Sequence, residues 1–371
     1  MILTIKQKLY KTKKTKFLER KLGVACYIYN HCIAVQKTYY RLFKKYLTKA
    51  KLQAHLAQLK KTHPWWKQVN SQTIQNIVER IDWGYQKFFR QENSRPPNFK
   101  GRHKYRSLTF KNSGWKVDRN HLMIQGATFK FHQSRPLGII KRLVVKRDPV
   151  GDWYVSFTCE VTEEPKSRIK TGQIAGFDFG LKTFLTSDSG EKTESPEFYR
   201  QGIKLIKKLG RKLSSKKKGS GNRARARIAL ARTHRKVANQ RLDHHFKLAK
   251  ELAETFDEIF IEDLCLKGMV QLWGRKVNDL GFAQFASILK WQCKKHGASL
   301  VKIDRFYAST KTCSCCEFVN ENLMLEDRQW TCPECSTHHD RDINAAKNIK
   351  RVGTSTLAGE RVSASSLAIA C

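Results

Sequence analysis

The feature that most restricts how this chain can fold is a set of four cysteines near its C-terminal end. They form two pairs, Cys313-x₂-Cys316 and Cys332-x₂-Cys335, separated by fifteen residues. Four thiolates at this spacing are typical of a structural zinc site, in which one tetrahedral ion holds two short turns together. The sequence therefore predicts a small zinc-bound module.

Neighbouring residues leave the ligand set partly open. Cys315 is either a free thiol or an alternative ligand, and His338 and His339 are either ligands or residues of an exit loop that faces nucleic acid or solvent. The other six cysteines are scattered singly through the chain. Scattered thiols in a chain without a signal peptide are typical of a reducing compartment. We therefore interpret the cluster as metal-binding rather than as part of a disulfide framework.

The formal charge of +40 on 371 residues limits the partners of the protein. Such an excess of positive charge destabilises a compact chain by self-repulsion unless a polyanion covers part of its surface. The candidates are nucleic acid and an anionic membrane. No apolar stretch approaches the length of a membrane span, and no signal peptide opens the chain. These observations favour DNA or RNA as the partner and argue against a membrane.

The spacing of apolar residues divides the chain into two patterns. The first begins with a strand, continues with amphipathic helices and turns to strands over residues 107–161. This order predicts a small β-barrel with a helical insertion. After a linker at 162–171, short strands alternate with helices, which predicts an α/β sheet. We expect the Ser-, Ala- and Thr-rich tail, residues 353–371, to be disordered or loosely packed.

Three acidic residues stand where an unpaired carboxylate is costly. Asp178 lies within the apolar strand pattern IAGFDFG, and Glu262 ends the apolar pattern DEIFIED. Asp342 opens a helix whose Ala345 and Ala346 allow close packing on a sheet. Taken singly, each is equally well a strand-end or helix-cap residue. Taken together in a basic chain, they are interpreted as one phosphodiester-hydrolysing site for Mg²⁺ or Mn²⁺.

Residues 201–250 contain 17 lysines and arginines and a single acid, Asp243, in a strongly helical composition. A charge run of this kind is usually a solvated helix face, but here the acids are too few for pairing within the helix. We therefore expect contacts to nucleic-acid phosphates. The residues concerned are Arg223, Arg225, Arg227, Arg232, Arg235, Lys236 and Arg241. Trp65, Trp66 and Trp115 are candidates either for stacking on bases or for core packing.

Five segments in strict order carry a resemblance to a known family. They are GFDFGLKTFLT, ARTHRKVANQRLD, FIEDL, YASTKTCSCC and CPECSTHHDRDINAAKNI. Over residues 172–350 they resemble TnpB, the transposon-encoded RNA-guided DNA nucleases related to type V CRISPR effectors. The N-terminal half fits more loosely, through YIYNHCIAVQK and RPPNFKGRHKYRSLTF.

The resemblance implies a multidomain α+β protein built around an RNase H-like (RuvC) α/β nuclease domain with a zinc-finger insertion. Its catalytic residues would be Asp178, Glu262 and Asp342. The implied boundaries are 1–12 and 100–165 for a wedge β-barrel, 13–99 for a helical recognition insertion, 172–311 and 337–352 for the split nuclease, and 312–336 for the zinc finger.

The family pattern also separates neighbouring candidates. It places the catalytic acid two residues before an asparagine, which favours Asp342 over Asp340. Asp340 is then a turn or capping residue, and Asp263 and Asp304 are structural. The family usually has glycine after the second cysteine of each pair, a position that eases a left-handed turn. Glu317 and Ser336 stand there in this chain, which predicts strained turns or weaker metal binding.

The activity implied is RNA-guided cleavage of double-stranded DNA beside a short transposon-associated motif, with both strands cut at one RuvC-like site. The implied partners are a guide RNA from the transposon end and the target DNA, with one protein chain per RNA in a prokaryotic cytoplasm. The alternative is a guide-RNA-dependent repressor that binds DNA without cutting. Relatives of that kind typically lose acids of the triad, and all three acids are present here. A transposase that rejoins DNA itself has no support from the family motifs, and a guide-independent resolvase leaves the basic N-terminal half unexplained.

Overall fold

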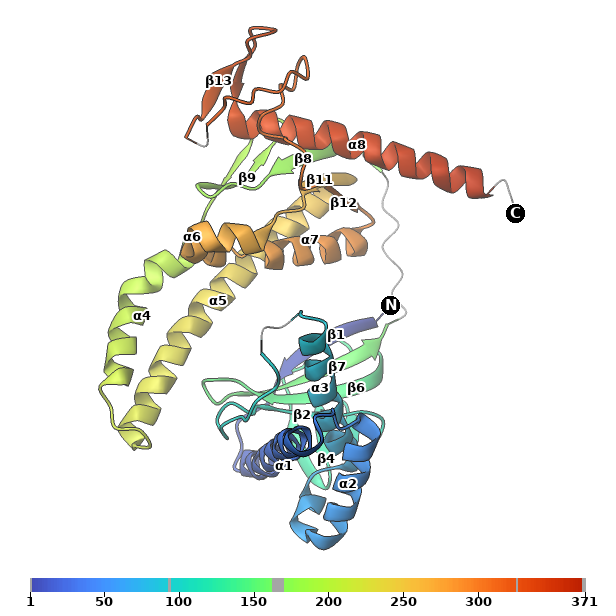
Figure 1. Ribbon diagram of the computed structural model, residues 1–371, viewed down its shortest axis with the longest axis vertical. Helices are drawn as coiled ribbons and strands as arrows, with labels where there is room; N and C mark the ends of the chain where they lie inside the picture. The colour runs from blue at the N-terminus through green and yellow to red at the C-terminus, as the bar shows by residue number, and fades with distance from the viewer. Residues whose placement is uncertain (1, 93–94, 162–169, 325, 369–371) are drawn as a thin grey trace. The chain divides into compact units, whose positions relative to one another are not determined.

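In the computed structural model the chain forms two compact units, Met1–Glu164 and Pro165–Cys371 (Figure 1). The structure describes residues 2–92, 95–161, 170–324 and 326–368. Most of the linker expected at 162–171 lies outside these residues. Within them, no helix combines the length and the apolar composition needed to cross a membrane.

The first unit contains two antiparallel sheets. The larger has the strand order β1, β7, β6, β2, with bounds Ile2–Lys8, Trp153–Glu160, Ile139–Arg147 and Ser107–Phe110. The smaller has the order β3, β4, β5, with bounds Trp115–Asp118, His121–Ile124 and Ala127–Lys130. A bridge between Leu9 and Phe131 links the end of β1 to the end of β5. A turn joins β6 to β7, and in it Asp148 Oδ1 accepts hydrogen bonds from the amides of residues 150–152.

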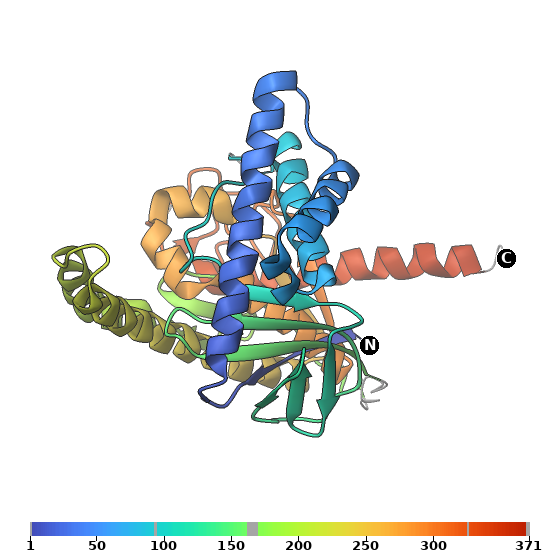
Figure 2. The same ribbon diagram turned by 90° about the horizontal axis from the view of Figure 1, so that it is seen from below.

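The helices of this unit lie between β1 and β2 in the sequence. They are α1 (Thr15–Phe43), α2 (Lys49–Thr62), a short 3₁₀ helix (Pro64–Gln68) and α3 (Ser71–Phe89). Figure 2 shows α1 as the long blue helix with α2 and α3 beside it. The apolar stripe predicted along α1 is buried, and it shares one hydrophobic core with the strands. The short, polar α2 has a weak apolar pattern, and sequence analysis did not predict it.

The second unit is built on a five-stranded sheet with the order β10, β9, β8, β11, β12. The bounds are Lys192–Glu194, Thr183–Ser187, Ile174–Asp178, Glu258–Glu262 and Ser299–Ile303. Strands β8, β11 and β12 are parallel, whereas β9 and β10 are antiparallel to their neighbours. The predicted alternation of strands and helices is confirmed as a mixed α/β unit.

Helices lie on both faces of this sheet (Figure 1). They are α5 (Gly221–Thr255), α6 (Leu266–Leu280) and α7 (Phe282–His296) on one face and α8 (Arg341–Ala368) on the other, whereas α4 (Phe198–Ser214) packs along α5. Side chains alternate between the two faces of β11. Ile259 and Ile261 pack with α5 and α7, whereas Phe260 packs with α8. A two-stranded sheet, β13 (Gln329–Thr331) and β14 (His338–Asp340), precedes α8.

Most of the tail for which disorder or loose packing is expected, residues 353–371, falls within α8, and residues 369–371 lie outside the described residues. Helix α8 continues through Gly353 to Ala368. A Cβ built on Gly353 would overlap the ring of Phe260, so the glycine lets the helix lie directly on β11. Val352 and Leu357 pack in the same cluster. These contacts hold the first turns of the helix beyond position 352 against the sheet.

Candidate carboxylate and cysteine sites

Two of the candidate acids end neighbouring parallel strands. Strands β8 and β11 pair in register up to Phe177 and Ile261, and Asp178 and Glu262 are the next residues on each strand. They therefore lie at the same carboxyl-end edge of the sheet, where open α/β sheets bind their ligands. By the two-residue alternation of a strand, Asp178 shares its face with Gly176, and Glu262 shares its face with Phe260. Both carboxylates thus stand on the α8 face.

Helix α8 brings the third acid to this edge. A Cβ on Gly176 would overlap the carbonyl oxygen of Ala346, so the backbone of α8 rests directly on β8 at this glycine. Asp342 lies one helical turn before Ala346, in the first turn of α8. The close approach that Ala345 and Ala346 predicted is present, since both are buried.

The electrostatics of Asp178 show that the three acids interact. Burial, and then the negative charges of Asp342 and Glu262, raise the pKa of Asp178 to about 7, although Arg341 acts in the opposite direction. Burial also raises the pKa of Glu262. An acid in this environment holds its charge only at a cost unless a cation or a proton neutralises it. The geometry is therefore that of a cation-binding or proton-binding cluster.

Two arginines lie beside Asp342, and sequence analysis missed both. Arg328 Nη1 is 3.5 Å from Asp342 Oδ2, and Arg341 Nε is 3.7 Å from Oδ1. Arg328 belongs to the cysteine-containing segment, so this segment reaches the carboxylate site. No local sequence signal marks it, because the contact depends on β13 pairing with β14 just before α8.

Asp340 has a different role from Asp342. Its Oδ1 accepts hydrogen bonds from the backbone amides of Asp342 and Ile343, and its Oδ2 pairs with Lys192 at 2.8 Å. Asp340 is thus the cap of α8, as the sequence predicted. Burial would raise the pKa of Asp340, but the hydrogen bonds from Lys192 and the amides together hold that pKa below its usual range.

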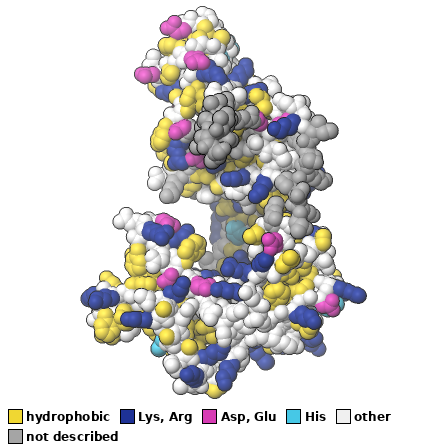
Figure 3. Space-filling view, turned by 90° about the vertical axis from the view of Figure 1, so that its right-hand side faces the viewer, with side chains coloured by type: hydrophobic (Ala, Val, Ile, Leu, Met, Phe, Trp, Pro, Cys, Tyr) yellow, Lys and Arg dark blue, Asp and Glu magenta, His cyan; other side chains and the backbone are white. Residues whose placement is uncertain are grey.

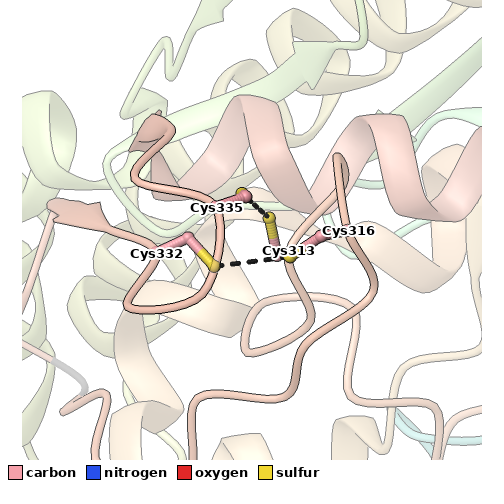
Figure 4. A group of neighbouring side chains, drawn as sticks. All are labelled: Cys313, Cys316, Cys332 and Cys335. Carbon is pink, nitrogen blue, oxygen red and sulfur yellow. Dashed lines mark hydrogen bonds between the residues drawn. The ribbon is translucent and has the colours of Figure 1, made fainter.

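The four predicted cysteine ligands converge. Their Sγ atoms all lie within 4.8 Å of one another. Cys313 and Cys335 are 3.6 Å apart and Cys316 and Cys332 3.5 Å apart, as the dashed lines in Figure 4 show. Sulfur ligands of one tetrahedral zinc ion are about 3.8 Å apart, so the cluster is compact enough for its four sulfurs to share one ion. Within the described residues, the three carboxylates are not gathered as tightly.

Each cysteine pair forms a tight turn with a left-handed residue. Glu317 has φ 68° and Ser336 has φ 57°. Their backbone amides donate to the carbonyl oxygens of Cys313 and Cys332, respectively. These are the two positions where the family usually has glycine. The turns therefore keep the glycine-type backbone with non-glycine residues, at a cost of about 1 kcal/mol each.

The histidines correct one expectation. Besides the alternative of a ligand, His339 was expected in an exit loop facing nucleic acid or solvent, and the loop placement is wrong. It is instead buried, with Nε2 3.1 Å from Cys313 Sγ and its ring against Trp330. The reason is its place in β14, whose side chains alternate so that His339 points inward and His338 outward. Cys315 is exposed and lies outside the sulfur cluster.

Two buried asparagines join the cysteine segment to α8. Asn344 Oδ1 accepts from the amide of Ser314, and its Nδ2 donates to the carbonyl of Thr312. Asn348, one turn later, donates to the carbonyls of Thr312 and Ser309. Sequence analysis did not assign them this role. Polar residues four apart on the buried face of a helix would have indicated such an anchor.

Comparison with known proteins identifies the family. Residues 156–272 match the family model OrfB_IS605, "Probable transposase", and residues 282–349 match "Cas12f1-like, TNB domain". A protein of Streptomyces pristinaespiralis, named "Putative RNA-guided DNA endonuclease", is 31% identical over 346 residues, covering 91% of this chain and 85% of its own. The chain belongs to the TnpB family.

Other relatives agree with this membership. The protein "Putative RNA-guided DNA endonuclease InsQ" of Escherichia coli K12 is 25% identical to this TnpB-family chain and covers 93% of it, with 90% of its own length matched. Among solved structures, a Cas12f1–sgRNA–target DNA complex aligns with a TM-score of 0.56 at 14% identity, covering 91% of this chain and 83% of that one. At this identity the similarity concerns the fold.

The basic helices of this TnpB-family chain divide into two groups of arginines. Arg223 donates to the carbonyls of Leu213 and Lys216, which closes the turn between α4 and α5, and Arg241 donates to the carbonyl of Asn278. These two predicted phosphate contacts already have protein partners. Of the other predicted residues, Arg225, Arg227, Arg232 and Lys236 are exposed along α5, and Arg235 is half-buried. Lysines and arginines are also spread over the face shown in Figure 3, where acids are fewer.

The predicted tryptophans fall mostly in the core. Trp66 is fully buried, and the Trp115 indole donates to the carbonyl of Lys111. Only Trp65 retains substantial exposure among the three. Asp263 forms ion pairs with Lys302 and Arg305, as expected of a structural acid.

Proposed function

We propose that this TnpB-family protein is an RNA-guided DNA endonuclease. It would cleave target double-stranded DNA beside a short transposon-associated motif, with a guide RNA from the transposon end supplying the sequence specificity. Family membership and the names of the full-length relatives support this activity. The observation that carries the proposal is the convergence of three carboxylates at one sheet edge, with Asp178 perturbed by both partners.

The same reasoning supports a domain assignment. The second unit would be a RuvC-like nuclease domain over 172–311 and 337–352, interrupted by a zinc finger over 312–336. In the first unit, the strands would form the wedge over 1–12 and 100–165, and the helices the recognition insertion over 13–99. The hydrogen bonds of Asn344 and Asn348 support the interrupted arrangement, since the nuclease helix and the cysteine segment fold onto each other.

The chain's own residues have separate tasks in cleavage. Asp178, Glu262 and Asp342 would hold two divalent ions, for which their hard oxygen atoms suit Mg²⁺ or Mn²⁺. Such ions activate a water molecule and stabilise both the attacking and the leaving oxygen of an in-line displacement. Arg328, beside Asp342, would orient that carboxylate and face the phosphate that enters.

The cysteine segment would bind zinc for a structural purpose. Four sulfur ligands leave no open position for a reactant, which distinguishes a structural from a catalytic zinc site. Because this segment carries Arg328 and anchors Asn344, its metal would fix the geometry of the first turn of α8. Exposed residues Arg225, Arg227, Arg232 and Lys236 would contact the sugar–phosphate backbone.

The guide-dependent repressor is the alternative, and it is not favoured. Such a protein needs RNA and DNA binding but no cation cluster. Retaining Glu262 and Asp342 beside Asp178, where their negative charges raise the pKa of Asp178, is a destabilising feature without a function in a repressor. The carboxylate site therefore supports cleavage.

A programmed-cleavage assay tests the proposal. The protein is purified with RNA expressed from its own transposon end, and that RNA is sequenced and re-targeted. With Mg²⁺ and a plasmid library of flanking motifs, we expect double-strand cuts only beside one motif and only with the matching guide. Cleavage by a preparation freed of RNA would contradict the guided mechanism. Motif-dependent binding without cuts would favour the repressor.

A further inference from the structure

A pocket in the helical part of the first unit is separate from both candidate sites. It encloses about 520 Å³ between the C-terminal turns of α1 and α3, and its lining is mainly aromatic. The rings include Tyr40, Tyr46, Tyr85 and Phe89. This volume is within the range of sites for small ligands and cofactors.

The walls of the pocket are held in place by hydrogen bonds. The buried side chain of Gln36 donates to the carbonyl of Leu47 and accepts from its amide, which fixes the chain just after α1. Tyr46 is thereby placed so that its hydroxyl donates to Asp82 on α3 at 2.8 Å. Its ring centroid lies 5.4 Å from that of Tyr85 and 5.5 Å from that of Phe89. The aromatic surface is thus formed before any ligand arrives, which limits the entropy lost on binding.

The rim of the pocket is positively charged. The segment 36–46 contains four lysines and arginines and no acid. Lys37 and Lys44 line the pocket, and Lys44 Nζ stands 6.0 Å from the centre of the Tyr40 ring. Lys37 donates to Asn98, which leaves further ammonium hydrogens. Neither lysine forms an ion pair with an acid in the part of the chain that the structure describes. The ammonium group of each can therefore bind a phosphate.

We propose that this pocket binds one unpaired base of a bound nucleic acid. The base would stack on Tyr40 or Phe89, and its phosphate would lie on Lys37 or Lys44. The inference rests on the proposed function in that it requires RNA or DNA as a partner. The aromatic rings complement the flat face of a base, and the lysines on the rim complement its negatively charged phosphate. An apolar peptide would match the rings but would leave the lysines without a counter-charge.

Binding of labelled single strands to the RNA-free full chain tests the proposal. The probes are an oligoadenylate RNA and an oligoadenylate DNA, measured by fluorescence anisotropy over a range of salt concentrations. The variants are Tyr40→Leu and Phe89→Leu, because these residues are 59% and 52% exposed and neither belongs to the buried core of the unit. Phe43→Leu is the matched control, because Phe43 is 57% exposed on α1 but does not line the pocket.

Loss of a stacked base should weaken binding about 5- to 150-fold. We expect this loss in both pocket variants, with an unchanged salt slope and with wild-type binding by the control. Lys44→Gln should instead reduce the salt slope, because it removes a phosphate contact. A loss on one probe alone identifies RNA or DNA as the source of the base.

Two results would overturn the proposal. Wild-type affinity of both pocket variants for both probes would exclude base stacking in the pocket. Light scattering that shows a wild-type dimer dissociated by Tyr40→Leu would assign the surface to a second copy of the chain. Both measurements are independent of cleavage. If the wild-type protein fails to cut DNA while the pocket variants lose oligonucleotide binding, only the proposed endonuclease activity is contradicted.

Discussion

The cysteine site and the carboxylate site are adjacent but are built in opposite ways. The four cysteines come from one segment, residues 313–335, and two local turns aim all four sulfurs at one point. The three carboxylates come from β8, β11 and α8, and meet only after the sheet has formed and α8 has packed on Gly176. One site is local in sequence, whereas the other depends on the tertiary fold.

This difference determines how each site should depend on its metal. A zinc ion bound by four local cysteines supplies folding energy to its own segment. The carboxylates are already positioned by the sheet, and their mutual repulsion opposes folding until it is neutralised. Removing a cysteine should therefore damage structure first, and removing a carboxylate should damage chemistry alone.

The largest effect should come from Asp178→Ala. We expect cleavage of both strands to fall by about a thousandfold or more, because the ion-holding carboxylate is lost. RNA binding should be unchanged, since affinity comes from basic residues and base pairing. Glu262→Ala and Asp342→Ala should behave alike, and double variants should be no worse. Single-turnover cleavage and RNA-binding assays measure both quantities.

Asp340→Ala is the control for this series. Asp340 caps α8 and pairs with Lys192, so its loss should cost about 1 kcal/mol of stability but leave most of the activity. An inactive Asp340 variant beside an active Asp342 variant would exchange the roles of the two acids.

The next largest effect should come from Cys332→Ser. We expect zinc content to fall well below one ion per chain and residues 313–335 to lose hydrogen-exchange protection. Protection should also fall at the start of α8, because Asn344 and Asn348 are anchored to carbonyls of residues 309–312. Cys315→Ser is the matched control and should keep its zinc. Near-stoichiometric zinc in Cys332→Ser would require a different fourth ligand, such as His339.

The local cysteine site can be predicted from the sequence more completely than the carboxylate site, which depends on the tertiary fold. Spacing alone identified all four cysteines, because a ligand set within one segment needs no tertiary information. Asp178 and Glu262 were identifiable as charges in apolar strands and Asp342 as the acid that opens a helix. Arg328 was not identifiable, since it reaches Asp342 only through the pairing of β13 with β14. His339 was misplaced because two adjacent histidines in a three-residue strand give no alternation to interpret. Arg223 and Arg241 resemble their exposed neighbours in sequence and differ only in the carbonyls they meet.

A smaller effect concerns the pH dependence of the carboxylate site. The pKa of Asp178 in the folded, metal-free protein is about 7, above its ordinary value. The folded protein therefore holds an extra proton between about pH 4 and pH 7, and stability falls as pH rises through this window. We expect Asp178→Asn to remove this fall in a thermal-denaturation series without metal. Mg²⁺ must displace the same proton, so its affinity should rise about tenfold per pH unit up to pH 7. Identical pH dependence in wild type and variant would show that Asp178 is not the titrating group.

The smallest effect sharpens the description of the cysteine turns. Ser336 adopts φ 57°, a conformation that glycine enters without the steric penalty of a Cβ. Ser336→Gly should therefore stabilise the cysteine segment with its proposed zinc, by less than about 1 kcal/mol because glycine also gains entropy in the unfolded chain. A chelator competition should show zinc held up to about fivefold more tightly. Ser336→Ala is the control, since it removes the hydroxyl but keeps the Cβ.

Glycine in the first cysteine turn, at Glu317, should stabilise the segment less than glycine at Ser336. Glu317 has the same left-handed backbone, but its carboxylate pairs with Arg351 on α8. Glu317→Gly relieves the turn and removes that exposed ion pair, which is worth up to about 1 kcal/mol, so the two contributions should nearly cancel. A gain at Ser336 together with no gain at Glu317 would show that backbone strain limits the local site. Equal zinc affinity for Ser336→Gly and Ser336→Ala would show instead that the bound metal already compensates for the strain.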